Sequence, residues 1–168
     1  MTDEPKLDLS GLYQIGMVVE DLDRSLERYW HVLGVGPWRV YTFEQSMARE
    51  TSYRGRPGNF KMRIAVAQMG PWTLELIQPL EGESIYREHL DRAGGGVQHM
   101  GIRVDNLEEA VRQAEAMGFQ VIQSARGHGL HGDGGWAYLD TEKEFGVILE
   151  LIEKPAERKP VEGRYPPE

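Results

Sequence analysis

The sequence contains no cysteine among its 168 residues. A chain without cysteine forms no disulfide bond, no zinc–thiolate site and no iron–sulfur cluster, and it has no cysteine nucleophile. Any metal site in this protein must therefore be built from histidine nitrogen and from carboxylate or amide oxygen.

Positive charge and long hydrophobic runs are also scarce. Acidic residues outnumber basic residues by 27 to 19, and the formal net charge is −8. Because proteins bind nucleic acid chiefly by neutralising phosphates with Lys and Arg, this balance argues against a nucleic-acid partner. A bilayer-spanning helix needs about 20 apolar residues, and the apolar runs here are much shorter. Residues 1–9 are polar, unlike a signal peptide, so we expect a cytoplasmic protein with no membrane partner.

The sequence repeats itself, and the repeat indicates how the chain is organised. Residues 13–22 (YQIGMVVEDL) align without a gap on residues 98–107 (QHMGIRVDNL). A later pair, residues 74–79 (LELIQP) and 149–155 (LELIEKP), follows in the same order. Two aligned pairs at similar spacing predict tandem modules. We expect an N-terminal extension at 1–10, modules at 11–79 and 94–155, a helical linker at 80–93 and a proline-rich tail at 156–168.

Each module begins with an alternating strand and continues with an amphipathic helix. In the first strand, Ile15 and Met17 share one face and Gln14 lies on the other. Apolar residues at helical spacing follow, beginning at Leu22 in the first module and at Leu107 in the second. Three further strands are expected in each module, at residues 38–53, 60–69 and 72–78 and at residues 119–125, 135–139 and 147–152. The pattern predicts an α+β fold of two tandem βαβββ modules.

Four polar side chains fall on the strand faces that point away from the expected helices. They come from the first and last strand of each module: Gln14, Glu75, His99 and Glu150. Any one of them alone is more often a solvated or structural residue. If the modules enclose one concave surface, however, two carboxylates meet there, and they cannot both stay ionised without a compensating charge. A divalent cation supplies that charge, and one imidazole with three oxygen ligands suits Zn, Ni, Co, Mn or Fe.

This arrangement resembles the vicinal oxygen chelate superfamily, whose tandem βαβββ modules each place one metal ligand in the first strand and one in the last. The resemblance rests on residues 12–26 and 94–104. The triple glycine at 94–96 and the sequence LELIQP at 74–79 are similar to methylmalonyl-CoA epimerases in particular. The resemblance implies a curled mixed sheet around one cavity that contains one divalent metal ion per chain. The implied ligands are Gln14, Glu75, His99 and Glu150.

The resemblance also implies a reaction. It points to a metal-dependent isomerase or epimerase that moves a proton at a carbon adjacent to a carbonyl of a small acid or acyl thioester. Glu150 and Glu75 are implied to act as general bases as well as ligands. Epimerases usually have histidine where this chain has Gln14, whereas some glyoxalases have glutamine there. The alternatives are a glyoxalase I-type lyase, another vicinal oxygen chelate enzyme such as an eliminase or ring-opening enzyme, and a non-catalytic small-molecule binding or resistance protein.

Three further residues are candidates for substrate binding. Arg103 shares a strand face with His99 and is suited to hold a substrate carboxylate, the alternative being a surface salt bridge. Tyr138 alternates with its neighbours, so it faces the cavity as a hydrogen-bond donor or fills the core. Glu50 is the third candidate, and Glu50 and Glu44 are the candidates for a second acid or base.

Several remaining features have two interpretations. The basic residues within 49–63 suit either substrate phosphates or a solvated hairpin. The glycine-rich loop around His128 and His131 suits a mobile lid rather than a metal site. His89 falls on the expected linker helix and is interpreted as a surface residue. The tail at 156–168 cannot form a core of its own, and we expect it to pack along the neighbouring chain of a homodimer.

Overall fold

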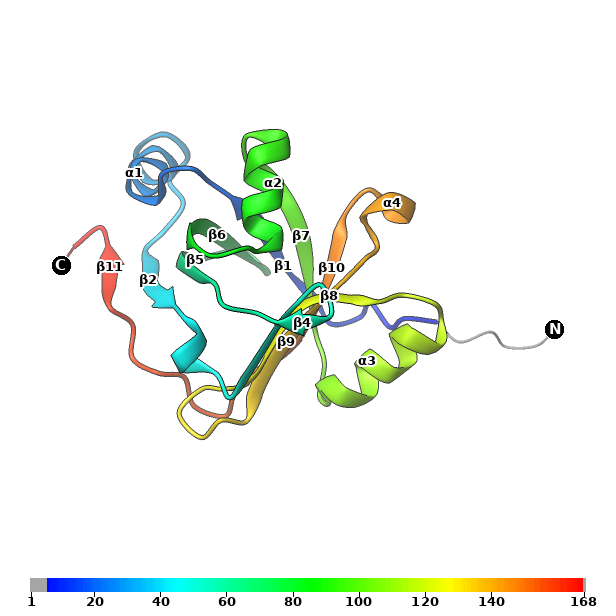
Figure 1. Ribbon diagram of the computed structural model, residues 1–168. Helices are drawn as coiled ribbons and strands as arrows, with labels where there is room; N and C mark the ends of the chain where they lie inside the picture. Colours follow the sequence, from blue (N-terminus) through cyan, green and yellow to red (C-terminus); the bar gives the residue numbers. More distant parts are fainter. Residues whose placement is uncertain (1–5, 168) are drawn as a thin grey trace.

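One curled mixed sheet forms the body of the protein, and the computed structural model describes residues 6–167 (Figure 1). The strands are β1 (Leu12–Val18), β2 (Trp38–Phe43), β3 (Glu50–Tyr53), β4 (Arg56–Pro57), β5 (Lys61–Met69), β6 (Trp72–Glu81), β7 (Gly96–Arg103), β8 (Val121–His128), β9 (Gly134–Leu139), β10 (Ile148–Glu153) and β11 (Gly163–Tyr165). The helices are α1 (Leu22–Leu33), α2 (Ile85–Ala93), α3 (Leu107–Ala116) and α4 (Glu142–Phe145), with a 3-10 turn η1 (Gln45–Met47). None of these helices from the described part of the chain is long and apolar enough to span a bilayer.

The two halves of the sheet are built alike. The element order β1-α1-β2-β5-β6 recurs as β7-α3-β8-β9-β10. The first strand of each half pairs parallel to the last, β1 with β6 and β7 with β10, and the halves join where β1 pairs antiparallel to β7. The full sheet order is β11-β2-β5-β6-β1-β7-β10-β9-β8-β3-β4. The prediction of an α+β fold with two tandem βαβββ modules in one curled mixed sheet is confirmed.

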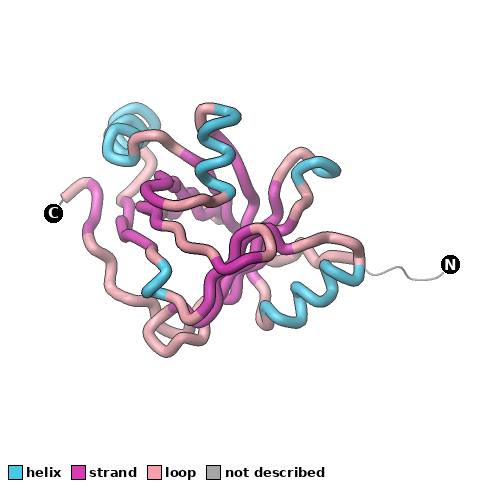
Figure 2. Tube along the Cα trace, in the orientation of Figure 1, coloured by secondary structure: helices cyan, strands magenta, loops and turns pink. Residues whose placement is uncertain are grey.

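Helix α1 covers the outer face of the first half. Asp21 caps its N-terminus by accepting a hydrogen bond from Arg24 N, and it ends at Gly34, which has a φ of 66°. Leu22 and Leu26 belong to the cluster between the helix and the outer faces of the first-half strands. Helix α3 repeats this arrangement in the second half, and Figure 2 shows the helices at the periphery with the strands between them. The opposite faces of β1 and β7 are therefore left for the inside of the curl.

Helix α2 lies in the segment expected to link the modules, and it packs against β1, β6 and β7. Ser84 caps the helix by accepting a hydrogen bond from Arg87 N. Its buried residues are Ile85, Tyr86 and His89. His89 is only 7% exposed, so the expectation of a surface residue is wrong. It lies four positions after Ile85 and therefore shares the buried face of the helix.

The segment expected to form one strand over residues 38–53 contains two strands that lie in different parts of the sheet. β2 ends at Phe43, the chain turns through η1, and β3 pairs antiparallel to β8 of the second half. The side-chain oxygens of Ser52 and Ser124 are hydrogen-bonded at 2.7 Å across this pair. β3 covers an edge of β8 that would otherwise expose unpaired backbone groups. The first half of the chain thereby crosses to the second.

The C-terminal tail packs against its own chain, and its packing along a neighbouring chain stays a prediction. β11 pairs antiparallel to β2, with Arg164 opposite Arg39. The Glu162 carboxylate accepts hydrogen bonds from the backbone N and the Oγ1 of Thr42 at 2.9 and 3.0 Å. The open edge of β2 supplies backbone partners that a short, proline-rich tail cannot find within itself.

Candidate metal centre

The side chains of Glu75, His99 and Glu150 converge from β6, β7 and β10 on the inside of the curl. His99 Nε2 lies 3.3 Å from Oε2 of Glu75 and 3.3 Å from Oε2 of Glu150. The three residues are 8%, 0% and 4% exposed, respectively. One ligand atom from each lies within 4.8 Å of the others. The structure therefore brings together three of the four residues that the resemblance implies as metal ligands.

Gln14 on β1 is the fourth of these residues, and it contacts both carboxylates. Its Nε2 donates hydrogen bonds to Oε2 of Glu75 at 3.0 Å and to Oε2 of Glu150 at 3.4 Å. The residue is 6% exposed. An amide has a donor nitrogen and an acceptor oxygen. Gln14 therefore bridges the carboxylates as it stands, and it offers an oxygen ligand when the amide turns over.

Two glycines make room for the ligands on the first strands. Gly16 lies opposite His99 in the β1–β7 ladder, and Gly101 lies opposite Gln14. A Cβ at Gly16 would lie 1.9 Å from His99 Cε1, and one at Gly101 would lie 2.9 Å from Gln14 Cβ. Sequence reasoning aligned these glycines in the repeat but did not assign them a role. Each half of the chain thus leaves space for the ligand that the other half supplies.

Gln98 fixes the orientation of the His99 ring. Its Nε2 donates a hydrogen bond of 2.9 Å to Ile85 O, and its Oε1 lies 3.0 Å from His99 Nδ1. Nδ1 therefore carries a hydrogen, and Nε2 faces the carboxylates. Within residues 6–167, Nε2 is a buried nitrogen without a hydrogen-bond partner, as expected of a metal ligand. Sequence reasoning missed Gln98, and its place directly before His99 is the one indication that the sequence contains.

The two carboxylates require a positive charge between them. Burial alone lowers the pKa of His99, but Glu150 and Glu75 outweigh burial and raise this pKa to about 9. Burial raises the pKa of Glu150, and the neighbouring His99 opposes that rise. A proton on His99 supplies the charge, and a divalent cation bound by the deprotonated ring and the carboxylates would supply it more fully. The donor set fits Zn, Ni, Co, Mn or Fe.

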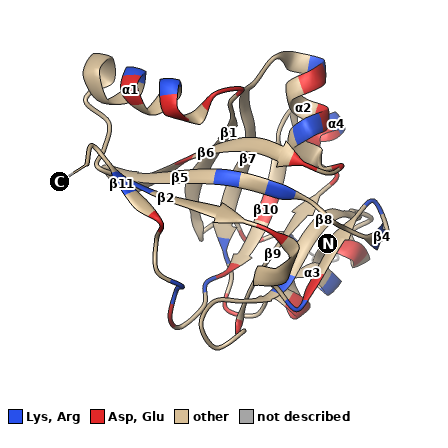
Figure 3. Cartoon of the chain, turned by 60° about the vertical axis from the view of Figure 1, so that its left-hand side comes forward, with Lys and Arg blue, Asp and Glu red and all other residues tan. Residues whose placement is uncertain are grey.

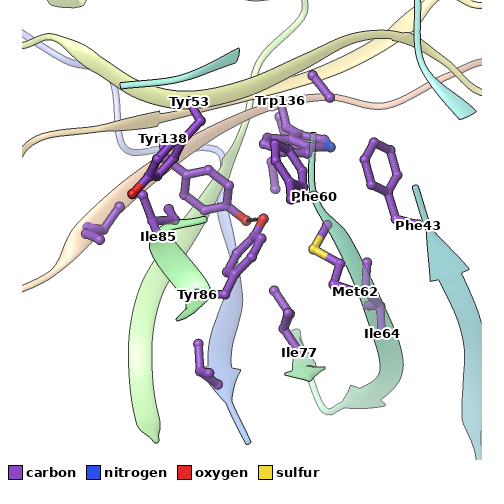
Figure 4. Close-up of a cluster of buried hydrophobic side chains, with 14 of the residues drawn as sticks. Phe43, Tyr53, Phe60, Met62, Ile64, Ile77, Ile85, Tyr86, Trp136 and Tyr138 are labelled. Carbon is purple, nitrogen blue, oxygen red and sulfur yellow. Dashed lines mark hydrogen bonds between the residues drawn. The ribbon is translucent and has the colours of Figure 1, made fainter. Parts of the chain in front are cut away.

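A cavity of about 620 Å³ adjoins these side chains. Gln14, Glu75 and Glu150 line it, and most of its remaining wall is aromatic or aliphatic. The aromatic lining residues are Tyr13, Tyr41, Phe43, Tyr86, Trp136 and Tyr138. Figure 4 shows Tyr86, Trp136 and Tyr138 gathered on this side of the sheet. A largely apolar cavity of this size with a few converging polar groups suits a small organic molecule.

Tyr138, a predicted substrate-binding residue, lines the cavity beside the metal centre. The Tyr86 hydroxyl donates a hydrogen bond of 2.9 Å to the Tyr138 hydroxyl (Figure 4). The Tyr138 ring lies 5.0 Å from the His99 ring, edge to face. Tyr138 accepts this hydrogen bond, so its own hydroxyl hydrogen is available for a further acceptor. Burial raises the pKa of Glu150, and a side-chain hydrogen bond with Tyr138 opposes that rise.

The other predicted substrate-binding residues lie elsewhere. Arg103, at the end of β7, and Glu50, at the start of β3, are exposed and do not line the cavity. Glu44, the alternative second acid or base, is also exposed and outside the cavity lining. Within the described chain, the carboxylates that line the cavity are those of Glu75 and Glu150.

The histidines of the glycine-rich loop are separated by the structure. His128 lines the cavity, whereas His131 is exposed and lies 3.3 Å from Glu157. In the described part of the chain, the group of side chains arranged to hold a metal ion contains neither of them. The loop therefore contributes to the cavity wall through His128 and Gly129, and its role as a mobile lid stays a prediction.

The basic residues within 49–63 are largely neutralised by ion pairs on the surface. The pairs are Arg54–Glu88 at 2.5 Å, Arg56–Glu83 at 2.6 Å, Lys61–Glu44 at 3.7 Å and Arg63–Asp23 at 3.0 Å. Their partners come from distant segments, which sequence proximity does not reveal. The pairs favour the solvated-hairpin interpretation over a phosphate site.

Comparison with known proteins adds a family and a fold. A family model described as the Glyoxalase/Bleomycin resistance protein/Dioxygenase superfamily matches residues 13–138. The uncharacterized protein YqjC of Bacillus subtilis is 26% identical over 145 residues, which cover 86% of this chain and 93% of that protein.

Solved structures with the same fold include methylmalonyl-CoA epimerases. The epimerase of Mycobacterium tuberculosis is 22% identical, has a TM-score of 0.65 and matches over 88% of this chain and 89% of its own. A Streptomyces coelicolor epimerase variant in complex with 2-nitronate-propionyl-CoA is 20% identical, has a TM-score of 0.67 and matches over 91% of this chain and 100% of its own. At these identities, the similarity shows that the fold is shared.

Proposed function

The chain belongs to the glyoxalase/bleomycin resistance protein/dioxygenase superfamily, the vicinal oxygen chelate proteins, and from this premise we propose that it is a metal-dependent isomerase or epimerase. The reaction is the transfer of a proton at a carbon adjacent to a carbonyl of a small acid or acyl thioester. The observation that carries the proposal is the buried Glu75–His99–Glu150 group at the wall of an apolar cavity.

The proposed centre consists of Glu75, His99 and Glu150, with Gln14 as a further oxygen donor. In the part of the chain that the structure describes, Nε2 of His99 has no hydrogen-bond partner and lies 3.3 Å from a carboxylate oxygen of Glu75 and of Glu150, and this convergence of one nitrogen and two oxygens is the observation that fits a metal. A divalent ion held there acts as a Lewis acid toward a carbonyl oxygen and makes the adjacent C–H bond more acidic.

The carboxylates of Glu150 and Glu75 are the proposed proton carriers. Burial favours the protonated form of Glu150 and raises its pKa, which suits an oxygen that accepts a proton from carbon. The two carboxylates come from opposite halves of the chain, on β10 and β6. In the proposed reaction, a carboxylate oxygen takes the proton from the α-carbon, and the return of a proton to that carbon completes the transfer. Tyr138 would donate a hydrogen bond to the substrate, and the apolar walls exclude competing water.

The substrate class is proposed from the neighbours and from the cavity. The Streptomyces coelicolor epimerase variant is in complex with 2-nitronate-propionyl-CoA, and this supports an acyl thioester as one substrate to test. We also expect a homodimer, as the resemblance implies, and sedimentation velocity should then give twice the mass of one chain.

A second candidate function, binding of a small molecule without metal, is favoured by the contacts of Gln14. Its Nε2 already bridges Glu75 and Glu150, and a proton on His99 offsets part of their charge. Both contacts hold the carboxylates in place without an ion, as a binding or resistance protein requires.

Two measurements test the proposed function. Metal analysis after reconstitution should find about one equivalent of divalent ion per chain, retained in His131→Ala and lost in His99→Ala and Glu150→Gln. Incubation with a panel of small acids and acyl thioesters in deuterated water should incorporate deuterium at the α-carbon, and His99→Ala should abolish this exchange. Less than half an equivalent of metal together with no exchange would overturn the proposal in favour of binding without catalysis.

A further inference from the structure

Basic side chains gather where the cavity meets the solvent. Five of the residues that line the cavity carry positive charge, and four of them belong to the C-terminal segment that folds back over it: Arg39, Lys154, Arg158, Lys159 and Arg164. We call these five residues the cationic mouth. They occur in a chain whose net charge is −8, so the local excess of positive charge is opposite to the character of the protein as a whole.

The cationic mouth lacks acidic partners. Within residues 6–167, none of its five side chains lies within 4.0 Å of a carboxylate. Arg54, Arg56 and Arg63, by contrast, are each paired with one. The chain therefore neutralises the basic residues of its surface hairpin and leaves those of the cavity available.

Two residues of the mouth face each other across a strand pair. Arg39 on β2 and Arg164 on β11 are directly opposite in the ladder, and Figure 3 shows basic residues where these two strands run side by side. Side chains directly opposite in an antiparallel pair lie about 5 Å apart at Cβ, and like charges there destabilise the pair. An anion between or beside two guanidinium groups at this spacing would relieve their repulsion and form charge-assisted hydrogen bonds with both.

The pKa of Lys154 also reflects the concentration of positive charge at the mouth. Burial lowers its pKa, and Arg158, Arg103 and Arg39 lower it further. Its ammonium lies 3.9 Å from the centre of the Tyr13 ring, a cation–π contact that compensates the charge only in part. Tyr13 also lines the cavity, so the ammonium is held at the cavity wall.

We propose that the cationic mouth binds a second anionic group of the substrate, a carboxylate or a phosphate, while the carbonyl-bearing end of the same molecule lies at the metal centre. This inference rests on the proposed function of the same cavity and names its substrate class. The mouth and the centre line one cavity, so one molecule can contact both. Tyr41, Phe43 and Ile64 also line this cavity, which suits a substrate with an apolar body.

The C-terminal segment then has a defined role. β11 and the residues before it supply Arg158, Lys159 and Arg164 to the mouth. Pairing of β11 with β2 holds this segment in place, and the Glu162 carboxylate is occupied by Thr42 rather than by the cations. The tail is thus a substrate-binding element that the chain folds onto its own cavity.

Anion binding can be tested separately from catalysis. Inorganic phosphate and succinate, as probes of the two anion types, are titrated into the protein by calorimetry at low salt. At least one probe should bind one site per chain. Arg158→Gln and Arg164→Gln should each weaken binding about tenfold, the loss of one charge-assisted contact. Arg112→Gln, which removes a surface arginine on α3, is the matched control and should bind as the wild type does.

A His99→Ala background distinguishes this inference from the proposed function. The probe should still bind there, since the mouth does not include the metal centre, and the arginine variants should still weaken it. Binding that is lost in His99→Ala but unchanged in the double variant Arg158→Gln/Arg164→Gln would place the anion at the metal and overturn the inference. If neither phosphate nor succinate binds at millimolar concentration, the inference is also overturned. Tighter phosphate binding indicates a phosphorylated substrate, and tighter succinate binding indicates a dicarboxylate, and both support the inference.

The arginine variants also provide a folding control. Because Arg39 and Arg164 repel each other, Arg164→Gln should not lower the melting temperature of the free protein. It should reduce the rise in melting temperature that the probe produces, since stabilisation by a ligand follows its affinity. A lowered melting temperature with an unchanged rise would show that Arg164 serves the fold and not the anion, which would contradict the inference.

Discussion

Replacing Gly16 with alanine should displace the His99 ring while leaving all four proposed metal ligands chemically unchanged. A Cβ at this position would lie 1.9 Å from His99 Cε1 and 2.0 Å from His99 Nε2. His99 is 0% exposed, so the ring can move only by disturbing its packed neighbours. Overpacking of this kind costs about 1–3 kcal/mol of unfolding free energy. The shifted ring should weaken metal binding by about 10- to 100-fold, the range found when groups that orient metal ligands are removed.

Alanine substitutions at two other glycines should have smaller effects than Gly16→Ala and so give a graded series. A Cβ at Gly101 would lie 2.8 Å from Ile152 Cδ1 and 2.9 Å from Gln14 Cβ. Gly101→Ala should therefore also lower the unfolding free energy and the metal affinity, but by less than Gly16→Ala. A Cβ at Gly163 would have no atom within 4 Å, which makes Gly163→Ala the matched control.

Urea denaturation and competition with a zinc-binding dye measure the two effects. The losses of stability and of metal affinity should both follow the order Gly16→Ala, Gly101→Ala, Gly163→Ala. If Gly16→Ala unfolds at the wild-type urea concentration and binds zinc with wild-type affinity, the contact between β1 and the imidazole does not position the ligand, and the reasoning is refuted.

Three further predictions concern groups around the cavity. Gln98→Leu removes the acceptor that orients His99, so zinc affinity should fall about tenfold or more; Gln98→Glu, which keeps an acceptor, should restore much of it, and equal affinities in both variants would contradict the assigned role. Burial lowers the pKa of His128 to about 4, below an unfolded value of about 6.5, so its contribution to stability is present above pH 6.5 and is lost as pH falls toward 4. His128→Asn should therefore remove up to about 3 kcal/mol of the pH dependence in urea denaturation, and an unchanged dependence would count against it. Tyr86→Phe deletes the hydrogen bond to Tyr138 and should cost about 1 kcal/mol in thermal denaturation, whereas a variant as stable as the wild type would show that the bond contributes nothing.

The fold and the candidate centre were predictable because the sequence contains two aligned repeats with polar residues at equivalent strand positions. The aligned segments at 13–22 and 98–107 locate Gln14 and His99 at the same position of two strands, and the later pair does the same for Glu75 and Glu150. Period-two alternation then assigns all four to the faces away from the helices. This information lies within short segments of the sequence, so it can be read without knowledge of the tertiary structure.

The features that escaped prediction depend on contacts between distant segments. β3 pairs with β8, and β11 pairs with β2, because open sheet edges accept any compatible strand; neither pairing has a counterpart in the repeat. The basic residues near 49–63 looked available because their partners, such as Glu83 and Glu88, lie in another segment. The same limitation concealed the cationic mouth, which β2 and the distant C-terminal segment assemble.

Anomalous diffraction from crystals grown with cobalt tests the central claim most directly. The account predicts one strong peak per chain, about 2.0–2.2 Å from His99 Nε2 and from a carboxylate oxygen of Glu75 and of Glu150. No peak at this position in fully reconstituted protein, or a peak only at an exposed pair such as His131 and Glu157, would contradict it.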